Sequence, residues 1–105
     1  MTVHDLSPAD VAAGLADDTM LLIDVREPHE VAMARIPDAV NLPLSSFDPR
    51  DIPDPQGRRV VFLCAGGIRS VQASEIAQSH GKPYDAHLAG GLKAWAMAGQ
   101  PFERG

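Results

Sequence analysis

The sequence is poor in cysteine and aromatic residues, and it has no long apolar run. Cys64 is the only cysteine among 105 residues, so no internal disulfide can form, whereas small secreted domains usually carry several. The apolar runs 20–23 and 60–65 are far shorter than the ~20 residues that a membrane helix needs. No signal-peptide pattern opens the chain. These absences predict a cytoplasmic protein in a reducing compartment, with no membrane partner.

Basic residues are also scarce. The chain carries 14 acidic residues against 9 Lys and Arg, a formal net charge of −5. Because no basic cluster is present, a nucleic acid is an unfavourable partner. Apolar residues make up 45% of the chain, which is ordinary for a globular protein and argues against disorder. The length fits one domain, so we expect residues 1–105 to form a single domain.

Glycine and proline divide the chain into short segments in which strand and helix patterns alternate. Ser7 and Pro8 are typical of a helix start, with serine as the cap and proline at the first helical position. We expect strands near 3–4 and at 21–25, 40–42, 59–63 and 84–88, and helices at 8–17, 28–34, 70–80 and 92–98. This alternation predicts an open α/β sheet, mainly parallel, with helices on both faces. The proline-rich stretch 43–57 is expected to be a loop with one helical turn near 45–47.

The segment with the clearest chemistry runs from Cys64 to Ser70. It follows the strongest predicted strand, and open α/β sheets bind ligands at the carboxyl ends of their strands. The helix that begins there offers unpaired N–H groups and a partial positive charge, and Gly66 and Gly67 let successive N–H groups turn inward. The positive electrostatic potential of the helix start and of the N–H groups favours a thiolate, so we predict that Cys64 is a nucleophile with a lowered pKa. Arg69 can bind an anionic substrate or brace the loop.

Four blocks of the chain occur in the order and spacing of a known family. They are Leu22-Ile23-Asp24-Val25-Arg26-Glu27, Ile36-Pro37 with Ala39-Val40-Asn41-Leu42-Pro43, Cys64–Ser70, and Leu88-Ala89-Gly90-Gly91-Leu92 with Ala94-Trp95 and Gly99-Gln100-Pro101. With these blocks the chain resembles the rhodanese-like sulfurtransferases of the small single-domain type. The resemblance implies a three-layer α/β/α fold with a five-stranded parallel sheet and the cysteine loop at one end.

The resemblance also implies a ping-pong reaction through a persulfide. The Cys64 thiolate would take the outer sulfur of thiosulfate or another donor, and cyanide or a thiol would then remove it. Arg69 matches the loop arginine of the family. The substrate is expected to bind at Ala65, Gly66, Gly67, Ile68, Arg69 and Ser70. No cofactor is implied, and because no second cysteine exists, the acceptor is a separate small molecule or protein.

Three alternatives stay open at the level of sequence. Cys64 could be a small buried hydrophobe at a strand end, where many free cysteines lie. Related phosphatases on the same fold have five residues between cysteine and arginine, and the four residues here, 65–68, favour sulfur over a phosphoryl group. The chain could instead carry a persulfide, or sense redox state, for a specific partner. The lone cysteine and the neutral Ala65, where some members carry a basic residue, motivate that third alternative.

The remaining residues have more ordinary interpretations. For Asp24 and Arg26, a structural ion pair or hydrogen-bond network that braces neighbouring loops is favoured over direct catalysis, which stays open as the alternative. Gly90 and Gly91 are expected to permit close approach of their loop to the active site. Ala34-Arg35 and Asp38 depart from the usual family pattern beside a structural turn. Trp95, Met97 and the other methionines are expected in the core. The four histidines, His4, His29, His80 and His87, lack the spacing of metal ligands, so no metal site is predicted.

Overall fold

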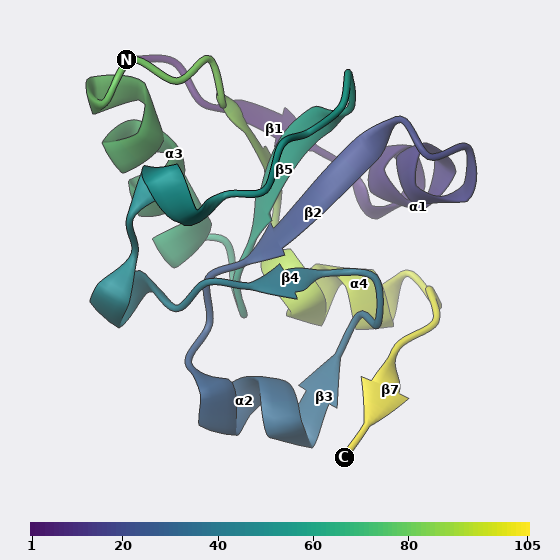
Figure 1. The fold of residues 1–105 in the computed structure, drawn as a ribbon. Helices are drawn as coiled ribbons and strands as arrows, with labels where there is room; N and C mark the ends of the chain where they lie inside the picture. Colours follow the sequence, from purple (N-terminus) through teal and green to yellow (C-terminus); the bar gives the residue numbers. More distant parts are fainter.

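The computed structural model describes all residues from 1 to 105. Figure 1 shows strands and helices that alternate along the chain. The strands are β1 His4–Leu6, β2 Met20–Asp24, β3 Ala34–Arg35, β4 Val40–Asn41, β5 Arg59–Leu63, β6 Ala86–Leu88 and β7 Glu103–Arg104. The helices are α1 Pro8–Ala16, α2 Pro28–Met33, α3 Arg69–Ser79 and α4 Gly91–Met97, with 3₁₀ turns η1 Leu44–Ser46 and η2 Pro49–Asp51.

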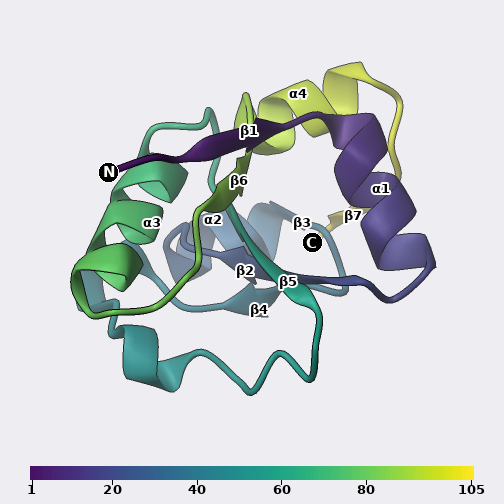
Figure 2. The same cartoon turned by 90° about the horizontal axis from the view of Figure 1, so that it is seen from above.

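The main sheet has five strands in the order β1-β6-β5-β2-β4, and every neighbouring pair is parallel. Helix α3 covers one face, and α1 with α4 covers the other (Figure 2). This is the predicted three-layer α/β/α arrangement. Because the carboxyl ends of parallel strands meet at one edge, the loop after β5 lies beside the ends of β2 and β6.

Side chains that alternate along the central strands divide the core into two clusters. Leu22 and Val61 face α1 and α4, whereas Ile23 and Phe62 face α3. This alternation follows from the two-residue period of a strand, and burial on both faces explains why β2 and β5 are continuously apolar. Trp95 lies in the first cluster with 2% of its surface exposed, which confirms its predicted place in the core.

The predicted boundaries agree with the structure to within about two residues, apart from the ends of the molecule. Ser7 caps α1 as expected, because its hydroxyl accepts a hydrogen bond from the Asp10 N–H. The predicted helix 28–34 was too long: Ala34 and Arg35 instead pair antiparallel with β7, a long-range contact that local patterns do not reveal. The second 3₁₀ turn, at Pro49–Asp51, was also not predicted.

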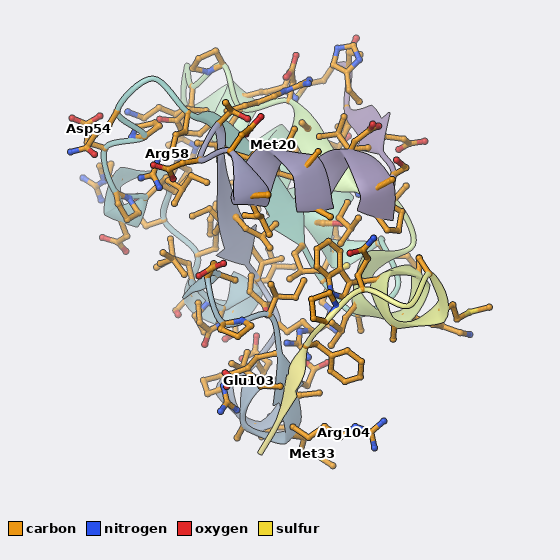
Figure 3. All side chains as sticks on the ribbon, turned by 90° about the vertical axis from the view of Figure 1, so that its right-hand side faces the viewer. Met20, Met33, Asp54, Arg58, Glu103 and Arg104 are labelled. Atoms are coloured by element: carbon orange, nitrogen blue, oxygen red, sulfur yellow. The ribbon has the colours of Figure 1, made fainter.

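The expectation that the methionines fill the core was wrong for three of the four. Met1, Met33 and Met97 are 73%, 74% and 81% exposed. Figure 3 shows Met33 at the edge of the molecule, near β7. Met20 alone packs on the core, against Gly14 of α1. The prediction rested on the residue type alone. Met33 and Met97 are exposed because they lie on the outward face of the last turns of α2 and α4.

Among the helices of the structure, none has the length and apolar character that a membrane span requires.

Candidate active site

Cys64 directly follows β5, and its loop leads into the first turn of α3. The Gly67 N–H donates to Cys64 Sγ at 3.0 Å, and the N–H groups of Gly66 and Ser70 also act on the sulfur. The sulfur therefore lies among inward-turned backbone donors at a helix start, as the glycines of the loop predicted. This arrangement is suited to hold negative charge on sulfur.

The first turn of α4 determines which way the loop amides point. The Leu92 N–H donates to the Cys64 carbonyl at 2.8 Å, and the Lys93 N–H donates to the Ala65 carbonyl at 3.1 Å. A peptide group is planar, with its carbonyl and N–H on opposite sides, so holding the Ala65 carbonyl against α4 turns the Gly66 N–H the other way. The hydrogen bonds from α4 thus leave loop N–H groups free for the sulfur.

Glycines allow the two loops to approach this closely. A Cβ on Gly91, which has φ +62°, would overlap the carbonyls of Cys64 and Ala65. Gly67 has φ +98°, and a Cβ there would lie 3.0 Å from the Gly90 nitrogen. Both positions therefore require glycine for conformation and for space, in agreement with the close approach expected of Gly90-Gly91.

Two opposing effects act on the thiol. Burial raises the pKa of Cys64, but hydrogen bonds from the Ser70 hydroxyl and from the backbone N–H groups of Ser70, Gly67 and Gly66 outweigh burial, so that the pKa is lowered from its ordinary value. The residue is only 1% exposed, beneath a loop in which Ile68 is 76% exposed. A sulfur donor must therefore pass the loop to reach Sγ.

Arg69, the first residue of α3, turns to α2. Its Nη1 and Nη2 donate to the two carboxylate oxygens of Glu30 at 2.6 and 2.9 Å. This hydrogen bond is the main reason that the pKa of Glu30 is lowered from 4.5 to about 2. Of the two roles considered for Arg69, the structure therefore shows the bracing contact, and sequence reasoning missed Glu30 as its partner.

Asp24 and Arg26 form the buried ion pair expected from the sequence. They are 1% and 3% exposed, and Arg26 donates to the carboxylate through its backbone N–H, Nε and Nη2 at 2.7–3.2 Å. Arg26 Nη2 also donates to the Ala34 carbonyl at 2.8 Å, and the Asn41 side chain donates to the carbonyls of Asp24 and Arg26 at 2.9 Å. The pair thus connects β2 to β3 and β4 and does not touch the sulfur.

His87 and Asp5 are two further residues of this region that the sequence did not predict. His87 of β6 is 4% exposed; its Nδ1 lies 2.8 Å from Ser70 Oγ, and its Nε2 lies 2.6 Å from Asp5 Oδ1. In the sequence His87 is one of four scattered histidines without the spacing of metal ligands. The sequence feature that could have predicted a hydrogen-bonded role for His87 is its position between Ala86 and Leu88, because a polar side chain inside a buried strand needs a partner.

The largest surface cavity lies elsewhere. It has a volume of about 350 Å³, and Trp95, Phe102 and Ile36 line part of it. None of the residues of the cysteine loop lines this cavity. The candidate active site is consequently a covered sulfur in a ring of backbone groups, and not an open pocket.

Comparison with known proteins agrees with this geometry. The Rhodanese-like domain family matches residues 7–98, so the chain belongs to that family. A protein of Allochromatium vinosum named "Sulfurtransferase" is 37% identical over 101 residues, which cover 95% of this chain and 94% of that protein. An uncharacterized protein of Synechocystis is 42% identical over 84 residues, which cover 80% of this chain but only 47% of that protein.

A solved structure shows the same fold. The crystal structure named as thiosulfate sulfurtransferase from Pseudomonas aeruginosa superposes with a TM-score of 0.84 at 29% identity, covering 98% of this chain and 20% of that one. The site and the family together define a rhodanese-type protein, and its relatives include proteins named sulfurtransferases.

Proposed function

We propose that this protein transfers a sulfane sulfur from thiosulfate or another donor to a thiol or cyanide, through a persulfide on Cys64. The observation that carries the proposal is the sulfur's place among the N–H groups of Gly66, Gly67 and Ser70 at the start of α3. The name of the Pseudomonas relative supports thiosulfate as a donor.

The first half of the reaction is a displacement at sulfur. The Cys64 thiolate attacks the outer sulfur of thiosulfate, a Cys64 S–S bond forms, and sulfite leaves with the electron pair of the broken S–S bond. The protein then holds Cys64–S–S⁻, whose charge the loop N–H groups and the helix start stabilise. In the second half an acceptor nucleophile attacks the outer sulfur, and the Cys64 thiolate is the leaving group.

The surroundings of Cys64 supply what this cycle needs. The lowered pKa makes the thiolate available as nucleophile and as leaving group. Donors fixed by α4 do not need to reorganise when the charge moves to the outer sulfur. Cys64 is the only cysteine, so the persulfide cannot be resolved within the chain, and an external acceptor completes the cycle.

A persulfide carrier that serves a partner protein is the second candidate function. The low exposure of Cys64, 1%, and the neutral side chain of Ala65 favour it, because neither feature helps to gather a free dianion from solvent. In this case a protein persulfide, and not thiosulfate, would load Cys64.

Steady-state assays separate the two candidates. The wild type and Cys64→Ser are compared with thiosulfate or a protein persulfide as donor and with cyanide or glutathione as acceptor. Thiocyanate or glutathione persulfide is measured with either donor, and sulfite with thiosulfate. Sustained turnover by the wild type alone supports the enzyme. Transfer only from a protein persulfide supports the carrier, and no Cys64-dependent transfer from either donor contradicts both.

A further inference from the structure

A continuous chain of hydrogen bonds leads from the sulfur to the surface. Cys64 Sγ lies 3.4 Å from Ser70 Oγ, Ser70 Oγ lies 2.8 Å from His87 Nδ1, and His87 Nε2 lies 2.6 Å from Asp5 Oδ1. Ser70 is fully buried and His87 is 4% exposed, whereas the Asp5 side chain is 75% exposed. These side chains come from α3, β6 and β1, so the sheet itself aligns them.

The chemistry of the groups fixes the direction of these bonds. An ionised Asp5 can only accept, so Nε2 of His87 carries the hydrogen. In a neutral ring Nδ1 is then an acceptor, and the Ser70 hydroxyl donates to it. The Ser70 oxygen is left to accept the S–H of Cys64. Every donor in this chain therefore has an acceptor, with the thiol at one end and a carboxylate at the other.

We propose that His87, held by Asp5, is a positioning residue that ionises Cys64 through Ser70. The S–H bond of Cys64 breaks and its proton goes to Ser70 Oγ, while the Ser70 hydroxyl proton goes to His87 Nδ1. The products are a Cys64 thiolate and a His87 imidazolium that is paired with the Asp5 carboxylate. Nδ1–H then donates to Ser70 Oγ, and the Ser70 hydroxyl hydrogen points to the sulfur.

The other charged side chains near these hydrogen-bonded residues already have partners of opposite charge. Arg69 is held by Glu30, and Asp85, the residue before β6, pairs with His4 and Arg59. Asp5 is consequently the charged group in contact with His87, and Ser70 is its link to Cys64. The role assigned to His87 rests on the proposed function, since it prepares the thiolate that this function uses.

The pH profile of Cys64 alkylation tests the inference without any sulfur donor. Rates with iodoacetamide, a neutral reagent, are measured for the wild type, His87→Gln, Asp5→Asn and Asp5→Glu. His80→Gln, on an exposed histidine, is the control. We expect His87→Gln to move the inflection up by roughly one pH unit, which lowers the rate about tenfold at any pH below both inflections. Asp5→Asn should move it in the same direction, and Asp5→Glu and His80→Gln should stay at the wild-type value.

An unchanged inflection in both His87→Gln and Asp5→Asn would overturn the inference. Asp5→Asn alters an exposed side chain and keeps the test valid if His87→Gln does not fold. The tautomer of His87, read from ¹⁵N NMR of the wild type, is a second test: Nε2–H is expected, and Nδ1–H contradicts the direction of the chain. If the profile shifts as expected but no donor loads Cys64, the proposed function fails while the role of His87 stands.

Discussion

At Cys64 the sign of the pKa shift is decided by competition between burial and hydrogen bonding. A buried thiol in apolar surroundings would remain protonated and inert, whereas the thiolate form of Cys64 is stabilised by hydrogen bonding with the N–H groups of its own loop and with the Ser70 hydroxyl. The sequence indicated the helix start and the glycines, and hence the direction of the shift. It could not indicate His87 and Asp5, because the contact of His87 with Ser70 and of Asp5 with His87 joins α3 to β6 and β6 to β1, which come together only in the folded protein.

The ionisation of Cys64 gives the first prediction. Since the pKa is lowered, the thiolate persists to lower pH than in a free cysteine. The rate of alkylation by iodoacetamide should therefore rise to its plateau with an inflection below about 8.5, the value of an unperturbed thiol. Because Cys64 is covered, a bulky maleimide should react more slowly than iodoacetamide. An inflection at or above the value of a free thiol contradicts the arrangement of the donors.

Among the elements, the contact between the cysteine loop and the start of α4 shapes the site. The sequence predicted this close approach from Gly90-Gly91, because glycine has no Cβ and lets two backbones come together. It did not predict that α4 would hold the carbonyls of Cys64 and Ala65. That contact depends on the register between β5 and β6, which local patterns leave undetermined.

Gly67→Val tests the geometry of the loop. A β-branched residue is strongly disfavoured at φ +98°, and its Cβ would lie 3.0 Å from the Gly90 nitrogen. We expect sulfur transfer to fall at least about tenfold, the effect of losing roughly 1.4 kcal/mol of transition-state stabilisation. Gly57→Val is the control, because Gly57 has a similar φ of +83° and open space around it. Gly57→Val should lose stability through its φ alone and keep its activity. Equal loss of activity in both variants would contradict a local role of Gly67.

The ion pair between α2 and α3 predicts a pH-dependent stability. The pKa of Glu30 is lowered from 4.5 to about 2 by its hydrogen bond with Arg69. A carboxyl with a lowered folded-state pKa contributes stability that is complete above pH 4.5 and is lost as the pH falls toward 2. Glu30→Gln should therefore be less stable than the wild type by about 1 kcal/mol at pH 7.

Denaturant titrations at pH 7 and at pH 2 measure this difference, with Glu75→Gln, on an exposed residue of α3, as the control. The gap between Glu30→Gln and the wild type should shrink toward zero at the lower pH. A gap that is the same at both values, or that appears equally in the control, would show that the pair with Arg69 is not its source.

At the scale of the whole molecule, the parallel sheet brings distant parts of the chain to one edge. The strand pattern predicted the sheet and its layers, because alternating apolar strands and helices have few other solutions. The pairing of β3 with β7 escaped prediction, since each strand has two residues and no pattern of its own. The network around Asp24 and Arg26 links this small sheet to β2 through Arg26 and the Ala34 carbonyl, and Asn41 of β4 adds side-chain hydrogen bonds to the carbonyls of Asp24 and Arg26.

Asp24→Asn tests the contribution of that network to stability. Removing one partner leaves the Arg26 charge buried, at 3% exposure, and such a loss typically costs about 3–5 kcal/mol. Asp48→Asn is a matched control, because Asp48 and Arg50 form the same bonds two residues apart, with the Arg50 side chain 82% exposed. We expect a large decrease in the denaturation midpoint for Asp24→Asn and little change for Asp48→Asn. Similar small changes would show that Arg26 is not held as a buried charge.

The mass of the intact protein after incubation with thiosulfate tests the central claim most directly. A sulfur atom stored on the thiolate adds ~32 Da, since one sulfane sulfur joins Cys64 as a persulfide. We predict this adduct on the wild type, its absence from Cys64→Ser, and its removal by cyanide or a thiol. If neither thiosulfate nor a protein persulfide produces the adduct, the ring of N–H groups around Cys64 does not serve sulfur transfer.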